Sequence, residues 1–126
     1  MVRRKPLFIL ALAVILGCVS CAEQKDTYYV AIYTISEATY TNLNMNITAV
    51  DALAWVRSQA GTGSAPNISH SGYSLEDVQD FLRGLNFDDT WLTPISNTLK
   101  QRGYSYARYT TGGTPPGYRF LYINRE

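Results

Sequence analysis

The sequence predicts an α+β domain, in which a small antiparallel sheet of about three strands carries its helices on one face. Three segments are dense in aromatic and β-branched residues, which is typical of strands. Three further segments place apolar residues at helical spacing, and they lie between the first strand and the last two. A chain of 126 residues, 46% of them hydrophobic, suffices for one such core. The expected order is β-α-α-α-β-β within a single domain at 27–126.

The first strand is expected over residues 27–35, a run dense in aromatic and β-branched residues. Apolar side chains occupy both faces of this segment, which predicts a central strand of the sheet. The first helix is expected from about Ala49 to Ala60. Thr48 stands three residues before Asp51, the spacing of a capping box, and Gly61 offers the end of the helix.

Two more helices follow the connection at 61–72, which we expect to be flexible. Ser74 and Asp77 form a capping box for the second helix, whose apolar stripe indicates that it packs on a core. The third helix is expected to begin near Pro94 with Thr93 as its cap, and to end at Gly103. Tyrosine-rich strands at 104–110 and 118–124 then flank a turn dense in Gly and Pro, which predicts a hairpin.

The N-terminus has the pattern of an export signal. Arg3, Arg4 and Lys5 precede an uncharged apolar run at 7–17, which is shorter than the roughly 20 residues that a spanning helix needs. The run ends in two cysteines, and the segments Ile15-Leu16-Gly17-Cys18 and Cys18-Val19-Ser20-Cys21 resemble the lipobox of bacterial lipoproteins.

The resemblance covers residues 1–21 and implies a signal segment whose Cys18 or Cys21 is lipidated, with Cys18 slightly preferred. Residues 22–26 would be a tether, and the protein would be held on the membrane of the cell envelope by its lipid. Two alternatives remain open. Cleavage after the small-x-small segment Ser20-Cys21-Ala22 would release a secreted or periplasmic soluble domain, and an uncleaved signal would anchor the chain directly.

Charge is unevenly distributed along the chain. The 11 basic and 10 acidic residues nearly balance overall. Residues 23–89, however, hold nine acids and three bases, whereas residues 100–126 hold five bases and one acid. The C-terminal hairpin region is therefore expected to be the basic part of the domain.

The sequence contains no recognisable catalytic or metal-binding pattern. His70 is the only histidine, and its neighbours Ser69 and Ser71 leave a small envelope hydrolase that uses His70 as the alternative function. No spacing of zinc ligands occurs, and the acidic residues around helix starts fit capping, so we expect neither metal nor cofactor. We accordingly expect a protein that is not an enzyme.

Residues 102–109 are similar to the RNP1 octamer of RNA-recognition motifs, whose aromatics stack on bases. Ser105 departs from the usual Gly or Ala, and such a motif belongs on an internal strand of a βαββαβ domain. A hairpin follows here instead, and export would remove the substrate. We therefore expect no nucleic-acid partner.

Period-2 alternation in the predicted hairpin gathers six residues on one face: Tyr104, Tyr106, Arg108, Tyr118, Phe120 and Tyr122. If this face points outward, it is an aromatic platform for an envelope protein or a glycan. If it is core instead, Arg119 and Arg125 mark the outside, and this alternative has at least equal weight. The function expected from the sequence is binding or structural association in the cell envelope.

Overall fold

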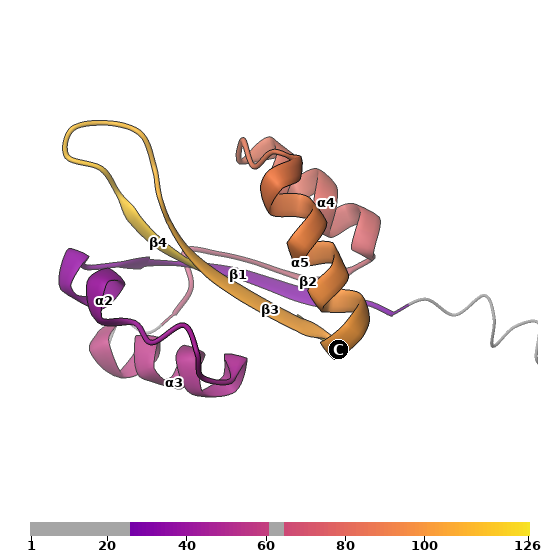
Figure 1. Ribbon diagram of the computed structural model, residues 1–126, viewed down its shortest axis with the longest axis horizontal. Helices are drawn as coiled ribbons and strands as arrows, with labels where there is room; N and C mark the ends of the chain where they lie inside the picture. Colours follow the sequence, from indigo (N-terminus) through magenta and orange to yellow (C-terminus); the bar gives the residue numbers. More distant parts are fainter. Residues whose placement is uncertain (1–25, 61–64) are drawn as a thin grey trace, which may run out of the picture.

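The computed structural model describes residues 26–60 and 65–126, which form an α+β domain with a four-stranded antiparallel sheet between two pairs of helices (Figure 1). The elements in chain order are β1 Tyr28–Ile35, α2 Glu37–Asn42, α3 Ala49–Ala60, β2 Ile68–Tyr73, α4 Leu75–Gly84, α5 Asp89–Arg102, β3 Tyr104–Thr110 and β4 Tyr118–Arg125. The strand order across the sheet is β2-β1-β4-β3.

Strand β1 is central, as its sequence predicts. It pairs with β2 on one side and with β4 on the other, and its successive residues alternate between two cores. Val30 and Ile32 face α4 and α5, whereas Ala31 and Tyr33 face α2 and α3. Burial on both faces explains why the segment reads as a continuous apolar run.

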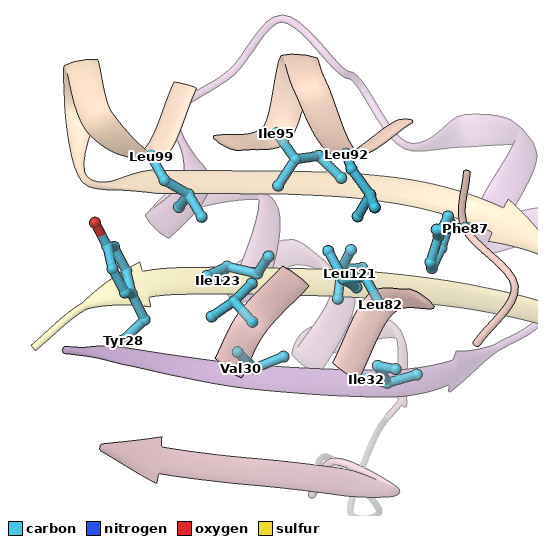
Figure 2. Close-up of a cluster of buried hydrophobic side chains, with 11 residues drawn as sticks. Tyr28, Val30, Ile32, Leu82, Phe87, Leu92, Ile95, Leu99, Leu121 and Ile123 are labelled. Carbon is cyan, nitrogen blue, oxygen red and sulfur yellow. The ribbon is translucent and has the colours of Figure 1, made fainter. Parts of the chain in front are cut away.

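The α4–α5 core fills one side of the sheet. Leu82 of α4 and Leu99 of α5 are fully buried against Leu121 and Ile123 of β4. Figure 2 shows the α5 side chains directed at these strand residues, with Phe87 at one end of the cluster. The apolar stripe of α4 therefore packs on a core, as predicted.

The α2–α3 core fills the other side, so the expectation that helices cover only one face is wrong. Ala52 and Val56 of α3 are fully buried in a cluster with Tyr33 and Phe120. The Tyr33 hydroxyl accepts a hydrogen bond from Arg57, at 3.0 Å from Nη2. The sheet is thus the middle of three layers.

The strand count was also too low, because β2 lies in the segment expected to be flexible. Its sequence, Ile68-Ser-His-Ser-Gly-Tyr73, is mostly polar, and its side chains are exposed or half-buried. An edge strand needs only backbone pairing along one side, which β1 supplies here. Hydrophobic patterning therefore could not reveal it. The short helix α2, capped by Ser36, was missed as well.

The predicted helix boundaries agree with the structure at α3 and α4 and differ at α5. The capping box of Ser74 and Asp77 is present, and Thr48 Oγ1 accepts from the Asp51 amide at 3.1 Å. Helix α5 begins at Asp89 rather than near Pro94, because the Asp88 side chain caps it by accepting from the Thr90 amide. Gly103, at a φ of 80°, ends this helix in the left-handed conformation.

Candidate functional site

The six residues predicted to form an outward aromatic platform lie on one face, but the helices α2 and α3 cover it. Phe120 and Tyr122 are only 0% and 6% exposed and belong to the α2–α3 core. The outward platform is therefore wrong for this face, and the alternative that the aromatic face is core is right. Its second part, that Arg119 and Arg125 mark an outer face, is wrong, because Leu121 and Ile123 on that opposite face are buried in the α4–α5 core. The cause is the second helical layer, which the sequence did not reveal.

Arg108 and Tyr118 fasten α2 to the hairpin. The Arg108 guanidinium lies 4.8 Å from the centre of the Tyr40 ring and donates a hydrogen bond to the Tyr40 carbonyl oxygen. The same ring packs against Tyr118, at a centroid distance of 5.1 Å. This guanidinium is thus folded back onto its own domain, next to the end of β3.

Tyr106 fastens the loop between α2 and α3. Its hydroxyl donates to the carbonyl oxygens of Ile47 and Met45, the latter at 3.1 Å. Partial burial, with the neighbouring Tyr104, raises the pKa of the Tyr106 hydroxyl, so it remains a protonated donor at neutral pH. Side chains on this face of β3 therefore hold the α2–α3 layer in place.

The backbone of β3 leaves one edge of the sheet open. Gly103 accepts from the Arg125 amide at 2.6 Å and Thr111 donates to Gly117 at 2.8 Å, so both lie in hydrogen-bonded pairs with the other side of the hairpin. Such pairs alternate along an antiparallel ladder. The backbone N–H and C=O groups of the residues with even numbers, Tyr104, Tyr106, Arg108 and Thr110, consequently point away from β4. We call these groups the β3 edge.

A hollow of about 400 Å³ lies beside the first half of the β3 edge. The loop after α2 borders it on one side and α5 on the other, so it opens between the two helical layers. Its lining residues are Met45, Asn46, Ile47, Thr98, Arg102, Tyr104, Ser105 and Tyr106. We call it the Met45 hollow.

A second hollow, of about 560 Å³, lies beside the last half of the edge. Both layers border it as well: Tyr40 of α2 on one side, and the α4–α5 connection with Trp91 on the other. The Trp91 side chain is 39% exposed, although its ring packs on Phe87, which in turn contacts Tyr109. Arg108 and Thr110 also line this Trp91 hollow.

The charge around the β3 edge is positive. Arg102, in the Met45 hollow, lies over the Tyr104 ring at 5.3 Å, and Arg108 lines the Trp91 hollow. No acidic residue lines either hollow. Within 26–60 and 65–126, the ion pairs are Arg83–Asp80, and Arg125–Asp26 with 3.0 Å between Nε and Oδ2, so neither joins Arg102 or Arg108 to a carboxylate.

No family model, curated protein or solved structure matches the chain in the three comparisons made.

His70 lies on β2, at the opposite edge of the sheet from the hollows. Its ring stacks on Tyr73 at 4.7 Å and meets the edge of Phe81 at 5.1 Å. Among the described residues, no serine hydroxyl or carboxylate is hydrogen-bonded to the imidazole. The neighbouring Ser71 hydroxyl instead donates to the carboxylate of Glu126. The structure therefore does not bring together the residues that the alternative function, a hydrolase using His70, would need.

Among residues 26–60 and 65–126, no three of the His, Cys, Asp and Glu side chains are grouped as metal ligands would be. Asp88 caps α5 by accepting from the Thr90 amide, and the hydrogen bond from the Thr90 hydroxyl lowers the pKa of its carboxyl group. None of the helices in the described part of the chain is sufficiently long and apolar to span a bilayer. Cys18 and Cys21, the predicted lipidation residues, lie outside the described residues.

Sequence reasoning found Tyr104, Tyr106 and Arg108 but missed the rest of the site. Trp91 stands at helical spacing with Ile95 and Leu99, which are buried, so spacing alone assigns it to the core. The signal that the sequence does carry is in β3, whose seven residues contain neither the Lys nor the Pro that commonly protect an edge.

Proposed function

We propose that this chain is an exported, lipid-anchored protein of the cell envelope that acts by binding a partner protein at the β3 edge, without catalysis. The observation that carries the binding proposal is the open backbone of β3 beside two hollows that hold aromatic and arginine side chains. Export and anchoring are supported by the basic start, the short apolar run and the cysteines at its end.

An open edge of this kind is a hazard for an isolated domain. Unpaired strand backbone is a template for pairing with other chains, and proteins commonly blunt it with lysine, proline, bulges or very short strands. Strand β3 has none of these, and the one basic side chain on it, Arg108, is turned onto Tyr40. A partner strand that pairs with this edge would satisfy its backbone N–H and C=O groups and so prevent uncontrolled pairing with other chains.

The anchor is tested by replacing both Cys18 and Cys21 with Ser and fractionating the cells. Lipid chains would supply the attachment, so the double variant should move from the membrane fraction to the soluble fraction. The two single variants identify the lipidated residue. Continued tight membrane association of the double variant would contradict the lipid anchor and indicate an uncleaved apolar helix.

The binding site is tested by photo-cross-linking in intact cells of the organism that makes the protein. A photoreactive amino acid at the exposed Thr110 on β3 should give a cross-linked product, whereas the same amino acid at the exposed Ser69 on β2 should not. Ser69 is the matched control because it lies on the other edge of the same sheet. Equal products at both positions, or none at Thr110, would contradict binding at the β3 edge.

A further inference from the structure

We propose that the β3 edge takes an extended, acidic polypeptide segment as a fifth strand of the sheet. This inference rests on the proposed function of the same edge and adds the chemistry and geometry of the partner. Addition of a strand is a known mode of peptide recognition, in which backbone hydrogen bonds give affinity and side-chain pockets give specificity. Three features of the described residues support it here.

The first feature is the backbone. Tyr104, Tyr106, Arg108 and Thr110 each direct one N–H and one C=O away from β4. These residues span about 20 Å of extended chain at the rise of a β-strand. The register of β3 with β4 is regular along its whole length, so no bulge interrupts the edge over the roughly seven residues with which a segment could pair.

The second feature is the space beside this edge. The hollows lie at its two ends, and each is bordered by residues of both helical layers, such as Ile47 and Thr98 at one end and Tyr40 and Trp91 at the other. The edge therefore has, at each end, a hollow that opens between the two helical layers. An extended segment paired with the edge would direct its side chains alternately towards the two layers.

The third feature is charge. Arg102 and Arg108 stand at opposite ends of the edge, each beside an aromatic ring and neither in one of the ion pairs described above. Carboxylates of an incoming segment would meet Arg102 directly, and they would meet a positive charge at the other end from Arg108, which lines the Trp91 hollow while it donates to the Tyr40 carbonyl oxygen. A second copy of this chain would bring two further arginines to the same edge, so self-pairing opposes like charges. Charge complementarity thus favours an acidic partner over a second copy.

The experiment measures binding of a labelled nine-residue peptide of alternating valine and glutamate, capped at both ends, to the full chain in detergent micelles. Two control peptides separate the contribution of charge from that of backbone hydrogen bonds. One carries lysine in place of glutamate, and the other is N-methylated at every amide. We expect the first peptide to bind and both controls to bind at least tenfold more weakly, because one loses the charge match and the other the backbone donors.

Variants of the chain locate the binding. Thr110→Pro removes one outward N–H while the side chain there is exposed, so affinity should fall about fivefold relative to Thr110→Ala, the effect of one hydrogen bond. Arg102→Gln should also weaken binding, whereas Arg83→Gln, on an exposed face of α4, should not. If the proline variant folds poorly, the comparison of Arg102→Gln with Arg83→Gln still tests the proposal.

Four outcomes would overturn the proposal. Equal affinity for the N-methylated peptide would show that the hollows bind acidic groups without strand addition, and equal affinity for the lysine peptide would exclude the charge match. A dimeric chain that binds no peptide would show that a second copy occupies the edge. If no peptide binds while cross-linking through Thr110 persists, this inference fails and the proposed function stands; loss of both removes the proposed function itself.

Discussion

The two edges of the sheet differ in how well they are protected. Strand β2 has six residues, its register with β1 shifts between Tyr28 and Val30, and Gly72 adopts a φ of 74°. Strand β3 is longer and pairs with β4 in unbroken register, and two hollows flank its free side. A short, irregular edge resists pairing with other chains, whereas a regular one invites it. This difference supports β3, rather than β2, as the edge for the binding proposed above.

Packing next to the two edges should differ most. Phe120 of β4 is fully buried, and its ring lies 6.0 Å from that of Tyr106 on β3, so Phe120→Ala should cost about 3 to 5 kcal/mol of unfolding free energy. Ile68 of β2 is 40% exposed, and Ile68→Ala should cost less than about 1 kcal/mol. Denaturant unfolding measures both. Similar losses for the two variants would contradict the difference in burial between the neighbour of the β3 edge and the β2 edge.

The loop that borders the Met45 hollow should depend on one hydroxyl. Tyr106→Phe removes the hydrogen bonds to the carbonyl oxygens of Met45 and Ile47, which should cost about 1 to 2 kcal/mol. Tyr29→Phe is the matched control, since Tyr29 packs against Tyr122 through its ring. Thermal unfolding compares them. Equal stability of the two variants would mean that Tyr106 does not hold this loop.

The smallest effect is a local one at β2. Hydrogen bonds from Ser71 and then from the Gly72 amide lower the pKa of the Glu126 carboxyl group below its ordinary value of 4.5. A lowered folded-state pKa means that these bonds are present above pH 4.5 and are lost as the pH falls through the lowered value. The Gly72 amide proton shift in NMR should therefore titrate with a midpoint below 4.5, and Glu126→Gln should abolish the titration. A midpoint at or above 4.5 would contradict the contact.

Elements that bury a side-chain face in a core could be predicted from the sequence. Elements without such a buried face could not. The capping box at Ser74 marks a helix start in the sequence, and the apolar residues on both faces of β1 mark a central strand. Both predictions are confirmed. Strand β2 depends on backbone pairing with β1, which leaves no periodic trace in its side chains. The start of α5 was misplaced because Pro94 lies inside the helix and Asp88, not Thr93, caps it.

The candidate site was only partly accessible to sequence reasoning. Alternation grouped Tyr104, Tyr106 and Arg108 correctly on one face of β3, but it could not show that α2 and α3 cover that face. The hollows depend on where the loop at Met45 and the α4–α5 connection come to lie beside β3. Those positions follow from the order of strands across the sheet, which no local pattern encodes.

Amide hydrogen exchange of the free chain along β3 tests the central claim most directly. The claim predicts alternation: Ser105, Ala107 and Tyr109, which donate to β4, exchange slowly, and Tyr104, Tyr106, Arg108 and Thr110 exchange fast because their N–H groups form the open edge. Uniformly slow exchange along all seven residues would contradict it, because the edge would then be covered already.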